Sequence, residues 1–445
     1  MVSSVSRPTI YAPATAAGRA GVAVLRVSGP EAGMALRALA RRAPPPRVAT
    51  RARLVDPADG APLDDALVLW FPGPASFTGE DVAEFHLHGS RAAIDGVLAA
   101  LAALPGLRLA RPGEFARRAF DAGKLDLAEV EALADLIAAE TRAQARQALA
   151  QLGGALGARI EGLRDRTMRL LAQAEAEIDF PDEGDAPQGA IGAMRPGVDA
   201  LAADIAALLD DGRRGEILRE GFSVAILGPP NAGKSSLLNR LAGRDAAIVS
   251  EIAGTTRDTI EVRLDLGGWP VVLWDTAGLR ALDAADPQAV LEREGMRRTR
   301  ARADAADLKL IVLDARDPVP SGELAELARD GLVVLNKADL APGAAGLAVS
   351  ALTGSGIEAL EARLSDIVAA RLRGDASDAP ILTRARHREA LDEALAALAR
   401  ARALDVAELV GEELRACARA LGRIVGRTGV EDVLDVLFGE FCIGK

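Results

Sequence analysis

The chain has 445 residues, a length that predicts roughly two to four domains rather than one. Hydrophobic residues make up 49% and aromatic residues only 3%, so the cores must be built mainly from Leu, Val, Ile and Ala. The net charge of -11, from 53 basic and 64 acidic residues, argues against non-specific wrapping of nucleic acid and leaves room for a local basic site.

The number of cysteines and the lack of secretory or membrane-spanning segments in the sequence favour a cytoplasmic location. Cys417 and Cys442 are too few for a disulfide scaffold, which indicates a reducing environment. The first 14 residues lack a charged segment followed by an apolar core, and no apolar stretch is long enough to cross a bilayer. We therefore expect a soluble, cytoplasmic protein.

In chain order, the N-terminal part mixes short apolar runs with glycine and proline. Residues 22–27 and 66–70 are predicted strands and residues 94–104 a predicted helix, an α+β pattern. Residues 125–177 and 198–218 are rich in helix-forming residues with helical spacing. These segments predict a mixed N-terminal domain followed by helices.

Residues 221–375 then alternate strands and helices, and short apolar runs suit a buried parallel sheet. Helical texture returns over residues 383–437, so an α/β unit is inserted into an all-helical domain. The predicted domains are residues 1–121 (α+β), 122–218 (helical, first part), 219–376 (α/β) and 377–445 (helical, second part).

Residues 228–235 read Gly-Pro-Pro-Asn-Ala-Gly-Lys-Ser and fit the phosphate-binding loop G-x-x-x-x-G-K-[ST]. The loop follows a predicted strand and opens an apolar helix, the context that the motif requires. Its backbone N–H groups and the helix N-terminus attract phosphate. Lys234 is expected to reach the β- and γ-phosphates, and the Ser235 hydroxyl to bind Mg²⁺.

Two further motifs follow strands. Residues 275–278 (Asp-Thr-Ala-Gly) place a carboxylate for Mg²⁺ and a glycine N–H for the γ-phosphate, although a plain turn would look the same. Residues 336–339 (Asn-Lys-Ala-Asp) place Asp339 to accept hydrogen bonds from N1–H and the N2 amino group of guanine, which adenine lacks. Residues 350–352 (Ser-Ala-Leu) offer a backbone N–H to the guanine oxygen. Together the motifs predict an enzyme that hydrolyses GTP.

Leu279 occupies the position where Ras-like enzymes carry a glutamine that orients the attacking water. Another residue must therefore orient the water in this protein. Glu292 is a candidate to hold the attacking water, with a solvated helix carboxylate as the alternative and Glu294 as the fallback. Asn231 can ligate a monovalent cation beside the phosphates, and the switch-like loop of residues 250–256 can complete its shell. We therefore expect K⁺ to neutralise developing charge there.

These residues, with the switch Gly254-Thr255-Thr256-Arg257-Asp258 and the terminal Phe441-Cys442-Ile443-Gly444-Lys445, resemble the MnmE (TrmE) family of tRNA uridine-5-carboxymethylaminomethyl modification GTPases. Residues 21–29, 71–89 and 111–127 are similar as well, so the resemblance covers essentially the whole chain. It implies an N-terminal folate-binding and dimerising domain, an all-helical domain and an inserted Ras-like P-loop GTPase domain. It also implies a homodimer that forms a heterotetramer with an FAD-dependent partner, MnmG (GidA), and modifies the wobble uridine of tRNA.

Site residues follow from the same resemblance. K⁺ would be contacted by Asn231, Ser250, Ile252 and Thr255, and Mg²⁺ by Ser235 and Thr256. A 5-formyl- or methylene-tetrahydrofolate would be met by Arg26, Glu84, Lys124 and Lys445; solvated surface charges are the alternative. The complete expected GTP site comprises Asn231, Ala232, Gly233, Lys234, Ser235, Ser236, Ser250, Glu251, Ile252, Ala253, Gly254, Thr255, Thr256, Asp275, Thr276, Ala277, Gly278, Asn336, Lys337, Ala338, Asp339, Ser350, Ala351 and Leu352.

The remaining chemistry-bearing residues support weaker expectations. Within the family pattern Cys442 is tied to tRNA modification and could act as a nucleophile, whereas Cys417 is expected in a helical core. His86 and His88 share one face of a strand without further metal ligands, and His387 is expected at the surface. An arginine stripe at i, i+4 spacing is either a solvated face or a contact for the tRNA backbone; it comprises Arg415, Arg419, Arg423 and Arg427.

Two other classes of protein compete with a tRNA-modifying GTPase. A ribosome-assembly or signalling GTPase would use nucleotide-driven switching alone, but the sequence shows no G-x-x-G loop of a KH module. A folate-binding interaction protein with a vestigial nucleotide domain is opposed by the complete phosphate and base motifs.

Overall fold

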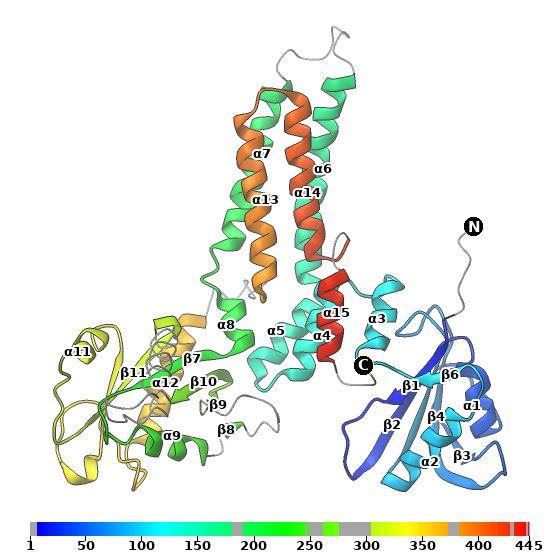
Figure 1. Cartoon of the computed structure of the whole chain (residues 1–445), viewed down its shortest axis with the longest axis horizontal. Coiled ribbons are helices and arrows are strands. Elements are labelled where there is room, and N and C mark those ends of the chain that lie inside the picture. The colour runs from blue at the N-terminus through cyan, green and yellow to red at the C-terminus, as the bar shows by residue number, and fades with distance from the viewer. Residues whose placement is uncertain are drawn as a thin grey trace, which may run out of the picture. The chain divides into compact units, whose positions relative to one another are not determined.

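The computed structural model describes residues 7–179, 190–244, 247–248, 261–275, 304–372, 382–427, 431–441 and 444 (Figure 1). Two compact units emerge: one contains the residues up to Ala134 and those from Gly422 onward, and the other contains Asp135–Leu421. None of the described helices is long and apolar enough to span a membrane. The domain limits proposed from changes in composition and periodicity along the sequence stay predictions.

The first unit is organised around a sheet with strand order β3-β4-β5-β2-β1-β6. Alternate residues of its central strands, such as Leu25, Val27 and Phe85, form a core beneath α1 and α2. The strands predicted at 22–27 and 66–70 are confirmed within β2 and β4. The elements are β1 (Thr9–Pro13), β2 (Ala20–Ser28), α1 (Ala32–Ala40), β3 (Thr50–Val55), β4 (Pro62–Phe71), β5 (Val82–Gly89), α2 (Arg91–Ala102), β6 (Leu107–Leu109) and α3 (Glu114–Asp121).

The C-terminal segment packs into the same unit. Leu437 and Phe438 of α15 (Glu431–Glu440) join a hydrophobic cluster with Leu127 at the start of α4 (Leu127–Ala138). Gly444, with φ +105°, lies so close to β1 that an added Cβ would be 1.8 Å from the carbonyl oxygen of Pro13. Residues from the two ends of the chain therefore meet on β1.

The other face of this sheet carries charged side chains around Arg118, which is only 3% exposed. Its guanidinium donates to Glu80 at 2.7 Å, to Glu114 at 3.2 Å and to the carbonyl oxygen of Pro8 at 2.7 Å. Burial raises the pKa of Glu114, but hydrogen bonds from Arg108 and from the Arg111 N–H outweigh it and leave that pKa at about 2. Glu114 is thus ionised in the folded protein and neutralises two arginines.

Replacing Glu114 by glutamine should lower the free energy of unfolding of this unit by about 2 kcal/mol at pH 7, because Arg108 and Arg118 lose their shared carboxylate. Since the folded pKa is lower than the unfolded one, the stability that the carboxylate contributes is present above about pH 4.5 and is lost as the pH falls towards 2. Urea unfolding should show the gap between variant and wild type closing over that window. Asp95→Asn, which removes the exposed Arg91 pair, is the control; an equal effect of both variants would contradict the assignment.

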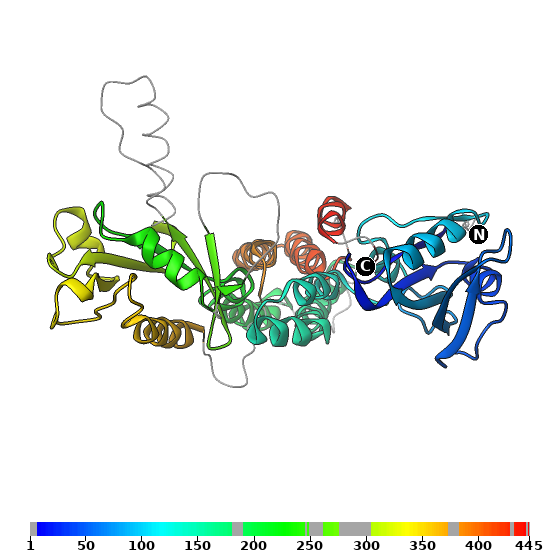
Figure 2. The same cartoon turned by 90° about the horizontal axis from the view of Figure 1, so that it is seen from below.

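Long helices dominate the second unit. Figure 1 shows α6, α7, α13 and α14 side by side, and Figure 2 shows them nearly end-on. The predicted helical stretch of residues 125–177 is interrupted because Thr141 and Gln144 form a capping box that begins α5. The helices are α5 (Arg142–Leu152), α6 (Ala155–Asp179), α7 (Ala190–Leu209), α8 (Arg214–Glu220), α13 (Ala385–Ala403) and α14 (Ala407–Ile424).

Two sequence expectations about this bundle are settled by burial. Cys417 on α14 is fully buried, with its Sγ 3.8 Å from Oγ1 of Thr167 on α6, and burial raises its pKa to about 11. The prediction of a core residue is confirmed. His387 was expected at the surface, which is wrong: it lies on the inner face of α13 and is 1% exposed.

The α/β part of the second unit has strand order β12-β11-β7-β10-β9-β8, in which β7, β10, β11 and β12 run parallel. One face is covered by α9 and α12, and Ile311 and Leu313 on the other face pack against α11. The carboxyl ends of the parallel strands therefore meet at one edge. The elements are β7 (Phe222–Leu227), α9 (Lys234–Ala242), β8 (Ala247–Ile248), β9 (Glu261–Leu266), β10 (Trp269–Asp275), β11 (Leu308–Asp314), α11 (Glu323–Leu327), β12 (Leu332–Asn336) and α12 (Ile357–Leu372).

Candidate nucleotide-binding site

The loop between β7 and α9 has the shape of a phosphate cradle. Gly228, at φ +151°, passes so close to β11 that an added Cβ would lie 2.1 Å from the carbonyl oxygen of Val312. Gly233, at φ +88°, leaves only 2.3 Å between an added Cβ and Nδ2 of Asn336. Both positions require glycine for conformation and for space. The loop therefore packs directly against the ends of β11 and β12.

Polar side chains of this loop are placed for a phosphate ligand. Lys234 is 9% exposed, and its Nζ donates to the carbonyl oxygens of Gly228 and Pro229, both at 2.9 Å. The Lys234 side chain therefore folds back over the loop, with its ammonium bonded to the loop backbone. Ser235 is exposed in the first turn of α9, and Asn231 is exposed with φ +61°. The arrangement offers one ammonium, one hydroxyl and a helix N-terminus to an anion.

The loop after β12 is joined to the phosphate loop by one buried amide. Asn336 Nδ2 donates to the carbonyl oxygen of Ala232 at 2.9 Å, and Asn336 Oδ1 accepts from the Ala351 N–H at 3.0 Å. Ser350, fully buried, donates its hydroxyl to Asp339 at 2.5 Å and so orients an otherwise exposed carboxylate. The structure thus brings the phosphate loop together with residues 336–339 and 350–352, about 100 residues further along the chain.

Lys337 has a partner that the sequence motifs did not identify. Its Nζ lies 2.9 Å from Oδ2 of Asp314, the last residue of β11, which pairs in register with Asn336. Hydrogen bonds from Arg316, together with the Lys337 ammonium, hold the pKa of Asp314 well below its usual range. The backbone of Lys337 is left-handed, with φ at +63°. In the sequence, the signal for this ion pair was that Asp314 ends the apolar run of the strand next to β12.

Many predicted site residues lie outside the described residues. Asp275 ends β10 opposite Ile226, which places its backbone at the same sheet edge. For the remainder the assignment stays a prediction: Ser250, Glu251, Ile252, Ala253, Gly254, Thr255, Thr256, Thr276, Ala277, Gly278, Glu292, Cys442 and Lys445.

A second polar cluster lies on the charged face of the N-terminal sheet. Arg26 on β2 and Glu84 on β5 are cross-strand neighbours, and Nε of Arg26 donates to Oε1 of Glu84 at 3.0 Å. The Arg26 guanidinium also lies over the rings of Phe77, at 5.6 Å, and Phe115, at 5.8 Å. His86 Nε2 is 3.1 Å from Oε2 of Glu84. The two aromatic partners were missed because single phenylalanines in a loop and a helix carry no motif.

The predicted partners of this cluster are only partly described. Lys124 is exposed beside the Phe77 loop, since an added Cβ on Gly79 would lie 3.7 Å from its Cε. Gly444 contacts Pro13, which pairs with Leu25 next to Arg26. The neighbour of Gly444, Lys445, lies outside the described residues. The structure therefore places Arg26 and Glu84 together, with Lys124 against the same loop.

Other candidate sites gain little support. His86 and His88 bind different carboxylates, Glu84 and Asp64, and among the described side chains no group of three His, Cys, Asp or Glu could hold a metal. In the arginine stripe, Arg415 pairs with Glu175 at 2.9 Å and Arg419 with Glu412 at 3.1 Å. These pairs favour a structural role for that part of the stripe.

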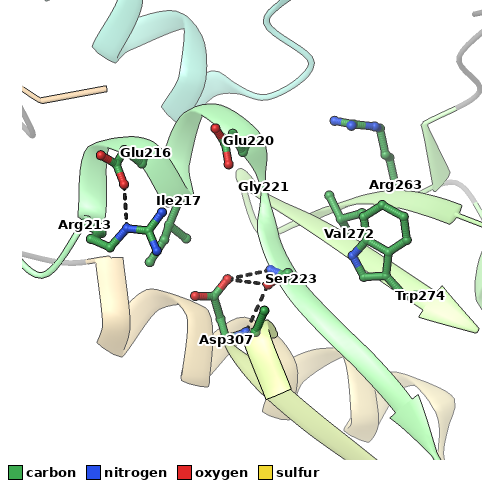
Figure 3. Close-up of a pocket in the computed structure, with 11 residues that line it drawn as sticks. Arg213, Glu216, Ile217, Glu220, Gly221, Ser223, Arg263, Val272, Trp274 and Asp307 are labelled. Atoms are coloured by element: carbon green, nitrogen blue, oxygen red, sulfur yellow. Dashed lines mark hydrogen bonds and ion pairs between the residues drawn. The ribbon is translucent and has the colours of Figure 1, made fainter. Parts of the chain in front are cut away.

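A cavity of about 180 Å³ lies elsewhere in the α/β part (Figure 3). Gly221 and Ser223, at the start of β7, line it, whereas the phosphate loop follows the end of that strand. Two polar pairs lie within its lining: Ser223 with Asp307 at 2.7 Å, and Arg213 with Glu216 at 2.6 Å. We assign it no ligand.

A glycine-bounded phosphate loop, an Asn-Lys-Ala-Asp loop and a serine-oriented carboxylate define a P-loop GTPase domain. A family model described as the MnmE helical domain matches residues 127–442, and one described as the GTP-binding protein TrmE N-terminus matches residues 9–124. The chain therefore belongs to the MnmE family, and it is a GTPase.

Full-length relatives agree with this assignment. A protein of Parvibaculum lavamentivorans named tRNA modification GTPase MnmE is 59% identical over 445 residues, covering 98% of this chain and 100% of the relative. Proteins of the same name from Rhodospirillum rubrum, 55% identical over 466 residues, and Methylorubrum populi, 53% identical over 448 residues, cover 98% and 99% of this chain and 99% of their own lengths.

Proposed function

We propose that this chain is a tRNA modification GTPase that adds an aminomethyl-type (carboxymethylaminomethyl) group to C5 of the wobble uridine of certain tRNAs. The identity of 59% over the full length to a relative named tRNA modification GTPase MnmE supports the proposal. We further propose that it works as a homodimer with an FAD-dependent partner of the MnmG (GidA) type, in a heterotetramer in the cytoplasm.

The nucleotide-site geometry supports the GTPase part. Lys234 would exchange its two backbone carbonyl partners for phosphate oxygens, which restores its hydrogen bonds with stronger, charged acceptors. Asp339, held by Ser350, would accept from N1–H and the N2 amino group of guanine. Asn336 keeps the loops for base and phosphate in register.

Metal ions fit this site through oxygen donors rather than an acidic cluster. We propose the exposed Ser235 hydroxyl as one ligand of Mg²⁺ and Thr256 as a second. For K⁺ we propose the exposed side chain of Asn231 as one oxygen donor, with Ser250, Ile252 and Thr255 completing the set. When bound, K⁺ supplies positive charge beside the phosphates. Glu292 is proposed to orient the attacking water.

GTP turnover should be about tenfold or more faster in KCl than in NaCl of equal ionic strength, because no arginine finger or glutamine is expected at this site. Phosphate release with excess GTP measures it. Asn231→Ala should remove most of the K⁺ advantage, whereas Asn239→Ala, on the exposed side of α9, should keep it. Equal rates of the wild type in both salts would refute the proposal.

The Arg26–Glu84 cluster supports binding of a formyl- or methylene-tetrahydrofolate. Glu84 offers a carboxylate to the N–H donors of a pterin, and Phe77, 38% exposed, offers a ring beside it. Lys124 is an exposed cation on the neighbouring loop, suited to the glutamate carboxylates of a folate. Lys445, the residue after Gly444, is proposed as the fourth contact.

Glu84→Gln should weaken binding of 5-formyl-tetrahydrofolate about 30-fold, because the amide loses the charge that accepts two pterin donors. Isothermal titration calorimetry of the full-length protein measures the change. Asp65→Asn, at an exposed Arg53 pair on β4, is the matched control. If both variants bind the folate as the wild type does, the cluster is structural.

Mass spectrometry of tRNA nucleosides from a strain without this gene tests the main proposal. We expect loss of the wobble-uridine 5-substituent and its return with the wild-type gene, but not with a Lys234→Ala gene. A Cys442→Ser gene should fail as well while its product still hydrolyses GTP, if the thiol acts in the modification. Unchanged nucleosides would instead favour a ribosome-assembly or signalling GTPase.

A further inference from the structure

The turn that carries Ser350, Ala351 and Leu352 is anchored to the phosphate-loop helix by a single arginine. Arg240, six residues after Lys234 on α9, donates Nε to the carbonyl oxygen of Ala351 at 2.8 Å and Nη2 to the carbonyl oxygen of Leu352. A planar guanidinium suits two acceptors side by side, which a lysine ammonium does not reproduce. Arg240 belongs to none of the nucleotide motifs.

The other polar groups of the turn are bonded in a fixed pattern. The Ser350 carbonyl accepts from the Gly354 N–H at 2.8 Å, and the Thr353 N–H donates to Oγ of Ser350 at 3.1 Å. The Ala351 N–H is taken by Asn336. Among the backbone N–H groups of residues 350–353, all of which the structure describes, the N–H of Leu352 is therefore the one without a hydrogen-bond acceptor. Leu352 is also 79% exposed, so a ligand can reach it.

The planarity of the peptide bond joins these two observations. In a trans peptide the C=O and N–H groups point in opposite directions. Because Arg240 holds the Ala351 carbonyl on the side of α9, the Leu352 N–H of the same peptide points away from α9. The second bond, to the Leu352 carbonyl, restrains the next peptide and prevents the turn from rotating.

We propose that Arg240 is a positioning residue for base recognition: it fixes the Ala351–Leu352 peptide so that the Leu352 N–H meets the oxygen at C6 of guanine. Adenine carries an amino group at that position, so an N–H fixed there faces another donor and rejects the base. The inference rests on the proposed assignment of this turn as the base-binding loop. Arg240 would thus add to the discrimination that Asp339 provides at the neighbouring N1 and N2 positions of the same edge of the base.

The affinities for two nucleoside diphosphates distinguish a positioning role of Arg240 from a general structural role. GDP has the C6 oxygen, whereas the 5′-diphosphate of 2-aminopurine riboside lacks both this oxygen and N1–H but keeps the 2-amino group, the ribose and the phosphates. The missing N1–H lowers its affinity for every variant alike, so the loss that each substitution causes, relative to the wild type, is compared for the two nucleotides. Arg240→Ala should weaken GDP binding about tenfold and the 2-aminopurine nucleotide by less than about twofold. Arg240→Lys should fall between, because one ammonium can hold one carbonyl firmly. Arg244→Ala, which removes the pair with Glu361 on α12, should leave both affinities unchanged.

Calorimetric titration of the full-length wild type and of each variant with both nucleotides gives the two dissociation constants per protein that the comparison needs. An equal loss for both nucleotides in Arg240→Ala, or no loss for either, would overturn the positioning role while leaving the GTPase assignment intact. If Arg240→Ala does not fold, the GDP-selective loss in Arg240→Lys decides the same question. A wild-type protein that binds the two diphosphates equally would overturn both the loop assignment and the role of Arg240.

Discussion

Replacing Lys234 by alanine should reduce GTP hydrolysis at least about 100-fold, because we propose that its ammonium, which lies over the phosphate loop, stabilises the transferring phosphoryl group. Nucleotide affinity should fall as well, more for GTP than for GDP, since the side chain is expected to meet the γ-phosphate. In the folded protein the same change removes the donor to the carbonyl oxygens of Gly228 and Pro229, which solvent can reach once the side chain is shortened. Stability should therefore change much less than activity.

Single-turnover hydrolysis with saturating GTP measures the first effect, and thermal unfolding measures the second. Lys309→Ala is the matched control, because Lys309 lies on β11 of the same sheet and pairs with Asp304 at 3.6 Å. We expect it to hydrolyse GTP at the wild-type rate. A Lys234→Ala protein that is folded and retains more than about a third of wild-type turnover would show that the phosphate loop is not catalytic.

Replacing Asp339 by asparagine should change which base is bound. Asparagine keeps one acceptor but presents an amide donor in place of the second carboxylate oxygen, so one guanine donor would face another donor. We expect GTP affinity to fall about 100-fold, from two charge-assisted hydrogen bonds worth about 3 kcal/mol together. Xanthine has N1–H and a carbonyl oxygen at C2, and xanthosine triphosphate should gain affinity in the variant.

Competition between labelled GDP and unlabelled GTP or xanthosine triphosphate gives both affinities in one experiment. Asp317→Asn, an exposed residue after β11, is expected to keep the wild-type preference. If Asp339→Asn lowers GTP affinity without raising that for xanthosine triphosphate, the carboxylate would be structural, and its bond from Ser350 would be its main function.

The sequence predicted the parallel sheet edge well, because each motif follows an apolar run and the ends of such runs must meet there. The contacts between Asn336 and the phosphate loop follow from that geometry. The partners of Arg26 could not be predicted, since Phe77 and Phe115 approach it from a loop and a helix without any periodic signal. Arg240 was missed for the same reason: a side chain that binds carbonyl oxygens leaves no pattern in the acceptor's sequence.

Failures in the fold prediction have local causes. β1 spans only five residues, too few for a visible alternation of apolar and polar side chains. Helix α2 begins at Arg91, three residues before the predicted start, because the Ser90 hydroxyl accepts the Ala93 N–H and caps it. His387 was misplaced because alanine-rich helices offer little contrast between inner and outer faces.

The close approach of Gly233 to Asn336 has a mechanical meaning for the ligand. A single amide is bonded to the phosphate loop on one side and to the base loop on the other, with no room for a side chain between. We therefore expect the distance between the phosphate loop and the proposed base loop to be fixed before a nucleotide binds. A ligand whose base and phosphates are separated by a longer or shorter linker should not reach both loops at once.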